Sequence, residues 1–215
     1  MNTLFVKQEL RKSFPAVLVL AAWLIEPGNS SILGQEGPGK RATAAVRKQK
    51  ELTSAALDLK GKPADPFSEP GKATVLVFLS TDCPIANRYA PEIQRLAKEF
   101  GSRGMKFWLV YPDADTSPSA ILRHTKEYRF TLRALRDPWH VLVGRAQVRV
   151  TPEVAVFHHD GRLLYHGRID DRFVDFGKER ASPTQHDLRE AMEAVLADKP
   201  VSRASTRAVG CYISQ

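Results

Sequence analysis

Cysteine is scarce in this sequence, and glycine and proline are not enriched enough for a repetitive chain. Its 215 residues contain 2 Cys, 13 Gly and 14 Pro. Two cysteines cannot build a disulfide-dense miniprotein, and they do not sit at the short spacing of a structural zinc knuckle. The glycine and proline content excludes a collagenous or low-complexity chain. What the sequence does have is 43% hydrophobic residues, which is enough for one sizeable folded domain with appendages.

The positive charge is concentrated at the N-terminus. The formal net charge at pH 7 is +8, and residues 1–50 supply +5 of it, with eight Lys or Arg and three Asp or Glu. The rest of the chain is therefore close to neutral and lacks the electrostatic footprint for phosphate binding. We expect no nucleic-acid partner.

The N-terminal segment has the order of a signal peptide. Lys7, Arg11 and Lys12 precede a nearly unbroken apolar run over residues 14–25. Twelve residues of helix at about 1.5 Å each reach about 18 Å, whereas a bilayer span takes about 20 apolar residues. Residues 1–27 are therefore predicted to direct export to the periplasm or the cell exterior. The alternatives are an uncleaved segment that associates with the membrane and a cytosolic extension.

The remainder divides into a linker, a domain and a tail. Residues 28–50 are rich in Gly, Ser, Lys and Arg, which predicts a flexible basic linker. Over residues 51–199, short apolar runs alternate with longer amphipathic segments, which is the order of an α/β domain. Residues 200–215 have no helical stripe and form a C-terminal tail that carries Cys211.

A buried strand followed by a kinked helix is the clearest local signal. Residues 72–79 form a continuous apolar run, as expected for a central strand. A helix is predicted from Pro84 to Gly101, with a kink at Pro91. Further strands are expected at residues 106–111, 132–135, 154–157 and 163–167, and further helices at residues 117–130 and 138–147.

A last helix is predicted to start at residue 182. Ser182 and Gln185 match a capping box, and Pro183 occupies the first helical position. The apolar stripe of this helix consists of Leu188, Met192, Val195 and Leu196.

Cys83 lies where the central strand meets the kinked helix. Unpaired backbone N–H groups and the positive end of the helix dipole favour a thiolate over a thiol there, which makes the sulfur a nucleophile. The neighbouring Asp82 acts in the opposite direction. We therefore predict a reactive, solvent-accessible Cys83. The alternative is a small buried hydrophobic residue at the end of a strand.

Three segments carry a family resemblance: Val75–Glu92, the run Val-Thr-Pro-Glu-Val-Ala-Val-Phe at 150–157, and Asp160–Arg162. Together they resemble the redoxin branch of the thioredoxin superfamily, which includes alkyl hydroperoxide reductase and thiol-specific antioxidant (AhpC/TSA) relatives. The resemblance covers residues 51–199. It implies a thioredoxin-like α/β fold, in which helices flank both faces of a central mixed β-sheet.

The resemblance also implies the site residues. Cys83 is expected to be the attacking thiol and Pro152 the cis-proline that faces it, preceded by Thr151. Ser80 and Pro84 complete the expected substrate-binding set. The implied partners are protein or small-molecule thiols and disulfides, the implied activity is that of an oxidoreductase with an antioxidant role, and no cofactor is expected.

Three positions depart from the family patterns. Ala86 replaces the second cysteine of Cys-x-x-Cys, so Cys83 has no neighbouring thiol to resolve it. Leu76 stands where family peroxidases carry proline, and Arg149 is three residues out of register with their arginine. Thiol-disulfide exchange is therefore the favoured chemistry. A one-cysteine peroxidase that uses Ser80 and Arg149 in altered geometry is the alternative.

Cys211, 128 residues after Cys83, is the only other cysteine. In an exported protein it could resolve Cys83 as a mobile thiol or form a disulfide with it, provided that the two Cα atoms come within about 7 Å. It could equally lie far from Cys83, which would leave that thiol to react with external thiols.

The histidines and one charged segment are the remaining candidates. His158 and His159 lie on a predicted turn and His166 on the next strand, and adjacent extended residues point to opposite faces, so no metal site is expected. Residues 170–180 are predicted to form a solvated loop, and the alternatives are a loop ordered by local salt bridges near the site and a partner-binding edge. A non-catalytic redoxin-fold module that binds a partner through this loop and the Cys211 tail is a further alternative.

Overall fold

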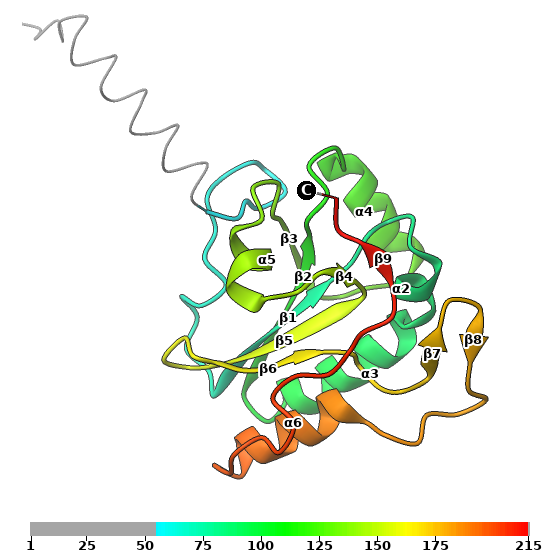
Figure 1. Ribbon diagram of the computed structural model, residues 1–215. Helices are drawn as coiled ribbons and strands as arrows, with labels where there is room; N and C mark the ends of the chain where they lie inside the picture. Colours follow the sequence, from blue (N-terminus) through cyan, green and yellow to red (C-terminus); the bar gives the residue numbers. More distant parts are fainter. Residues whose placement is uncertain (1–54, 215) are drawn as a thin grey trace, which may run out of the picture. The chain divides into compact units, whose positions relative to one another are not determined.

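A five-stranded mixed sheet organises the protein (Figure 1). The computed structural model describes residues 55–214. The strand order is β3-β2-β1-β5-β6, in which β1, β2 and β3 are parallel and β5 and β6 run antiparallel to their neighbours. The strands are β1 (Ala73–Phe78), β2 (Met105–Tyr111), β3 (Arg133–Arg136), β5 (Glu153–His158) and β6 (Leu163–Gly167).

Five helices and two small sheets complete the described part of the chain. The helices are α2 (Pro84–Arg88), α3 (Ala90–Gly101), α4 (Pro118–Glu127), α5 (Val141–Ala146) and α6 (Asp187–Leu196). One two-stranded sheet joins β4 (Val150–Thr151) to β9 (Cys211–Tyr212), and the other joins β7 (Phe173–Asp175) to β8 (Lys178–Glu179).

Strand β1 is the centre of the fold because both of its faces are buried. Val75 and Val77 pack in a core with side chains of α3, α4 and α6. Leu76 and Phe78 pack in a second core with side chains of α5. Each such fully buried side chain contributes about 1.5–3 kcal/mol relative to leaving it in water. The predicted α/β, thioredoxin-like arrangement, with helices on both faces of a mixed sheet, is confirmed.

The predicted helix 84–101 is divided in two at Tyr89. Pro91 lies in the first turn of α3 and has no N–H to donate to the carbonyl of Asn87, and its ring clashes with that carbonyl. The kink expected at Pro91 is therefore a break between α2 and α3. The break leaves a short helix, α2, that begins directly after Cys83.

Two further helices are shorter than predicted. Helix α4 ends at Glu127 rather than at residue 130, because Arg129 adopts a left-handed φ of 56°. Helix α5 begins at Val141 rather than at residue 138, after His140 with a φ of 55°. The carboxylate of Asp137 caps α5 by accepting the N–H groups of three of its residues, Val141, Leu142 and Val143.

The predicted capping box at Ser182 and Gln185 is wrong. Helix α6 begins at Asp187, with His186 as the capping residue. The reason is a long-range contact, because Asp171 accepts the backbone N–H groups of Thr184 at 2.6 Å and Gln185 at 2.9 Å. These bonds hold the segment before α6 as a loop.

The predictions for residues 1–27 and 28–50 lie outside the described residues. Within residues 55–214, no helix has both the length and the apolar character that crossing a membrane requires. The predicted tail from residue 200 packs on the domain, where β9 pairs with β4.

Replacing Asp171 should weaken the fold mainly above pH 4. Burial raises the pKa of Asp171, but hydrogen bonds from Thr184 and Gln185 outweigh it and lower the pKa from 3.8 to about 2. Its contribution to stability is therefore complete above pH 3.8 and is lost as the pH falls towards 2. We expect Asp171→Asn to lower the free energy of unfolding by about 1.5–3 kcal/mol at pH 7. The loss should shrink at pH 2, as measured by urea unfolding. The exposed Asp198→Asn is the control, and an equal loss at both pH values contradicts the assignment.

Candidate functional site

Cys83 lies in a buried position at the junction of β1 and α2. It is 1% exposed and is the capping residue of α2, with extended backbone angles (φ −82°, ψ 110°). Its sulfur makes no capping hydrogen bond to the N–H groups of the helix. Instead, the Cys83 Sγ lies 2.9 Å from the carbonyl oxygen of Thr151 and donates a hydrogen bond to it.

This contact corrects the prediction for the state of Cys83. A carbonyl oxygen has no hydrogen to donate and so cannot stabilise a thiolate. The expected solvent-accessible sulfur, held by the N–H groups of the following helix, is wrong for this conformation, because the sulfur is buried and makes no bond to those groups. The helix does begin at Pro84, as predicted, but the partner of the sulfur is a carbonyl group of the facing strand β4.

Thr151 contacts Cys83 through its carbonyl oxygen, and Pro152 follows it in the chain. The peptide bond between them is cis, and both residues are buried. Their position follows from the sheet register, in which Phe78 at the end of β1 is opposite Glu153 at the start of β5. The turn that leads to Cys83 and the loop that precedes β5 therefore meet at the same end of the sheet.

Cys211 is the second sulfur of the site. In the β4–β9 pair it stands directly opposite Thr151, whose carbonyl group accepts the Cys83 hydrogen bond. Burial, together with the nearby Cys83 thiol, raises the pKa of Cys211 from 9.0 to about 11. Both cysteines are free thiols. The structure thus brings together two residues that are 128 positions apart in the sequence.

The C-terminal segment forms an ordered strap over the site. We use the term C-terminal strap for residues 200–213. Figure 1 shows it in red, running from α6 alongside β6 to β9, next to α2. The N–H of His166 donates to the carbonyl of Ala204 at 3.0 Å, and the N–H of Thr206 donates to that of His166 at 3.1 Å. Beyond Cys211, the N–H of Ile213 donates to the carbonyl of Arg149 at 3.0 Å.

Two glycines allow the strap to lie this close. A Cβ atom added at Gly210 would be 2.2 Å from the carbonyl oxygen of Thr151, and one added at Gly167 would be 2.3 Å from the hydroxyl of Thr206. Gly167 also has a φ of 141°, which favours glycine. Any larger residue at position 210 would separate β9 from β4 and move Cys211 away from Cys83.

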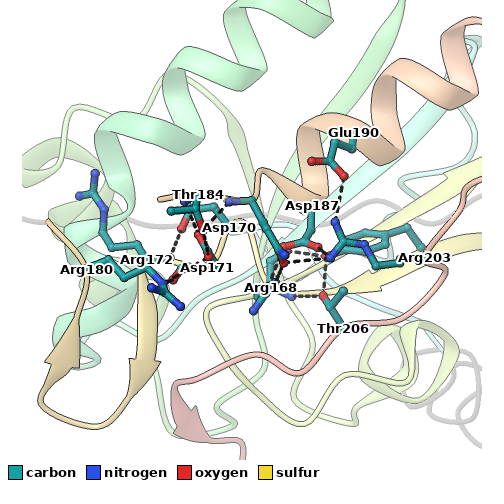
Figure 2. Close-up of polar contacts among 12 residues, drawn as sticks. Arg168, Asp170, Asp171, Arg172, Arg180, Thr184, Asp187, Glu190, Arg203 and Thr206 are labelled. Atoms are coloured by element: carbon teal, nitrogen blue, oxygen red, sulfur yellow. Dashed lines mark hydrogen bonds and ion pairs between the residues drawn. The ribbon is translucent and has the colours of Figure 1, made fainter. Parts of the chain in front are cut away.

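An ionic cluster anchors the other end of the strap (Figure 2). Arg203 of the strap lies 3.0 Å from one carboxylate oxygen of Asp187, and Arg168 donates to the other at 2.6 Å. The side chain of Asp187 is 1% exposed, so its charge depends on these two arginines. Arg203 also pairs with Glu190, and the Thr206 hydroxyl accepts the N–H of Arg168. The strap is thus fixed to the start of α6.

The remaining predicted site residues lie around this centre. Ser80 accepts the N–H of Cys83 through its backbone carbonyl at 3.4 Å, and Pro84 is exposed at the start of α2. Arg149 lines two surface hollows together with Tyr212, and Cys83 lines neither of them. Among residues 55–214, no hydrogen bond joins Arg149 to Cys83, and the carbonyl of Arg149 accepts the N–H of Ile213 instead.

The charged segment 170–180 is more than a solvated loop. It contains the β7–β8 hairpin, which packs on the junction of α2 and α3, where the Tyr89 hydroxyl contacts Asp170 at 2.5 Å and its ring contacts Phe173. Asp170 and Phe173 are buried, whereas Phe176 near the tip is 61% exposed. The sequence did not predict the contact between Tyr89 and Asp170. The only signal for a packed segment was the presence of two aromatic residues, Phe173 and Phe176, within a charged run.

Among the described residues, the histidines do not cluster with Cys, Asp or Glu side chains in a way that could bind a metal ion. The Nδ1 atom of His158 lies 3.0 Å from a carboxylate oxygen of Asp160 on the β5–β6 turn. Across residues 55–214, there is no group of three or more His, Cys, Asp or Glu side chains that could hold a metal ion.

Comparisons with known proteins support the family and the fold. A family model described as the AhpC/TSA family matches residues 46–166, more than half of the chain. No curated protein matches the chain. An uncharacterized conserved protein from Geobacillus kaustophilus is 22% identical, with a TM-score of 0.64 over 75% of this chain and 87% of that chain. A hypothetical protein from Sinorhizobium meliloti 1021 is 23% identical, with a TM-score of 0.62 over 74% of this chain and 91% of that chain.

Replacing Gly210 should uncover Cys83. Because the added methyl group of Gly210→Ala meets the Thr151 carbonyl, we expect overpacking to cost about 1–3 kcal/mol in the β4–β9 pairing. This corresponds to roughly 5- to 150-fold faster alkylation of Cys83 by iodoacetamide under native conditions, measured by mass spectrometry. Gly144→Ala is the control, because its added methyl group meets no atom within 4 Å. Unchanged alkylation in Gly210→Ala would show that the strap does not limit access.

Weakening the ionic cluster that holds the C-terminal strap should also speed the alkylation of Cys83, by a smaller factor than Gly210→Ala does. Arg203→Gln removes one of the two cations beside Asp187. Because the Arg203 side chain is 42% exposed, we expect a cost of about 1 kcal/mol, or roughly fivefold faster alkylation of Cys83. The control Arg103→Gln breaks an ion pair with Glu193 elsewhere on α6. Equal rates in the two variants would argue against a specific anchor.

Proposed function

Since the chain belongs to the AhpC/TSA family, we propose that it is a redoxin-type thiol-disulfide oxidoreductase whose Cys83 and Cys211 exchange two electrons with partner thiols and disulfides. The observation that supports this proposal is the placement of both cysteines at Thr151, whose carbonyl oxygen contacts the Cys83 sulfur and whose backbone pairs with Cys211. A disulfide between them would join the start of α2 to β9.

The order of attack follows from the environments of the two sulfurs. The thiolate is the attacking species in thiol-disulfide exchange, and a pKa of about 11 keeps Cys211 almost fully protonated at neutral pH. Cys83 stands directly before Pro84, at the position that the family resemblance gives to the attacking thiol, and is therefore assigned the first attack. Cys211 is suited to the second step, in which its contact with Cys83 replaces a bimolecular encounter by an intramolecular one.

The reaction has two exchange steps. In the first, the Cys83 thiolate attacks one sulfur of a partner disulfide, the S–S bond breaks, and one partner thiolate leaves and takes up a proton. In the second, Cys211 loses its proton and attacks the Cys83 sulfur of the mixed disulfide, which releases the second partner thiolate. The protein pair is oxidised by two electrons and the partner disulfide is reduced by two. The reverse sequence oxidises a partner dithiol.

Access to Cys83 requires movement of the strap. Because Cys83 is 1% exposed, a partner disulfide reaches it only after β9 separates from β4. That pairing involves two residues of each strand, so it belongs among the less stable parts of the fold. The surface then uncovered contains Thr151 and Pro152, flanked by Ser80 and Pro84, and we assign partner docking to these four residues.

We place this chemistry outside the cytoplasm. The support is the signal-peptide-like order of residues 1–27 and the presence of a cysteine pair that can form a disulfide, since disulfides persist in oxidising compartments.

Single cysteine variants test the proposal. Reduced protein is mixed with the aromatic disulfide DTNB, and the released thionitrobenzoate (TNB) is followed by absorbance. The wild type should release two TNB per chain and yield a tryptic peptide pair that links Cys83 to Cys211. Cys211→Ser should release one TNB and retain the other as a mixed disulfide on Cys83. Cys83→Ser should react at least tenfold more slowly than Cys211→Ser, because it lacks the first nucleophile.

Three outcomes contradict the proposal. Release without a Cys83–Cys211 link shows two independent thiols. Rapid peroxide consumption that forms a sulfenic acid on Cys83, with no exchange with DTNB, indicates a one-cysteine peroxidase. Equal rates for Cys83→Ser and the wild type indicate a non-catalytic module.

A further inference from the structure

A chain of buried polar side chains leads from the sheet to the Cys83 turn. The hydroxyl of Tyr111 on β2 lies 2.8 Å from Nδ1 of His124 on α4. The Nε2 atom of His124 lies 2.8 Å from Oδ1 of Asn87 on α2. The Asn87 amide nitrogen then donates to the carbonyl of Thr81 at 3.2 Å. Tyr111 is 1% exposed and His124 is 5% exposed, so water does not replace these contacts.

The Asn87 end of this chain fixes one hydrogen on His124. Because the Asn87 amide nitrogen donates to Thr81, the amide oxygen faces His124 and must accept, which requires a hydrogen on Nε2. In the neutral ring, Nδ1 is then the acceptor of the Tyr111 hydroxyl. Burial lowers its pKa below the ordinary 6.5, although the nearby Glu127 and Asp82 act in the opposite sense.

The end of the chain holds the backbone that carries Cys83. Asn87 lies one helical turn after Cys83, and its N–H donates to the carbonyl of Cys83 at 3.0 Å. Its side chain reaches back to Thr81, two residues before Cys83. Asn87 thus fastens both sides of the turn that sets the direction of the sulfur, and His124 fixes the orientation of the Asn87 amide.

The packing of this region does not by itself require the polar groups of Tyr111, His124 and Asn87. The ring of His124 lies against Tyr128 and Phe130, and Ile121 on the same helix is part of the apolar core. A buried polar group without its partner costs about 1–3 kcal/mol, so a fully apolar cluster would be simpler to stabilise. The polar chain ends at the turn that carries the reactive cysteine.

We propose that His124, acting through Asn87, is a positioning residue that keeps the Cys83 sulfur in line with Cys211. This inference rests on the proposed function, because it concerns the closure of the Cys83–Cys211 disulfide. Without His124, the Asn87 amide can turn away from Thr81, and the Cys83 turn loses one of its two ties. The effective concentration of one thiol at the other then falls.

The test measures the dithiol–disulfide equilibrium of the full chain in glutathione buffers. We expect His124→Leu to lower the effective concentration of the pair by about tenfold, equivalent to a shift of about 30 mV in potential. His124→Gln is the rescue variant. Its amide nitrogen can donate to Asn87, and its amide oxygen can accept from Tyr111. It should stay within about twofold of the wild type.

Two more variants separate positioning from stability. Ile121→Val removes a buried methyl group on α4, one turn before His124, and should lower the stability by about 0.5–1.5 kcal/mol without changing the equilibrium. Asn87→Ala removes the side-chain hydrogen bond to Thr81 at a half-buried helical position that tolerates alanine. It should lower the effective concentration by the same factor of about ten, and it serves as the test if His124→Leu does not fold.

The outcomes distinguish this inference from the proposed function. If the wild type never forms the Cys83–Cys211 disulfide in these buffers, the proposed function fails and the inference fails with it. If the wild type does form it, but Asn87→Ala leaves the equilibrium unchanged or Ile121→Val shifts it equally, only the positioning role of His124 is overturned.

Discussion

The hydrogen bond from the Cys83 thiol to the Thr151 carbonyl is the contact on which the site depends. It joins the turn after the central strand to the loop before β5, two segments that are 68 residues apart. The same Thr151 residue pairs with Cys211 through the β4–β9 ladder. One residue of the scaffold therefore contacts the Cys83 sulfur and pairs with the backbone of Cys211.

Much of the scaffold could be predicted from sequence because its signals are local. The apolar run of β1, the Cys83-Pro84 helix start and the disturbance of the helix by Pro91, predicted as a kink and found as a break at Tyr89, each depend on a few adjacent residues. The family resemblance added the placement of Thr151 and Pro152 opposite Cys83. Register explains that placement, because the antiparallel pairing of β5 with β1 aligns the two segments at one end of the sheet.

The features that could not be predicted depend on contacts between distant segments. The start of α6 is set by Asp171, which takes the N–H groups that a capping box at Ser182 would have used. The predicted exposure of Cys83 was wrong because its cover comes from the chain's own C-terminal strap. The link between His124 and Asn87 joins two helices, and each of these residues alone is an ordinary polar side chain.

The burial of Cys83 separates the chemical strength of a nucleophile from its availability. A reagent in bulk solvent first meets the outer side of β9, where Tyr212 is 83% exposed, and not the enclosed sulfur. The separation of β9 from β4 then limits which oxidants and electrophiles reach the sulfur, before their own reactivity matters. In such an arrangement, a thiol can be intrinsically strong and still be spared by indiscriminate reagents.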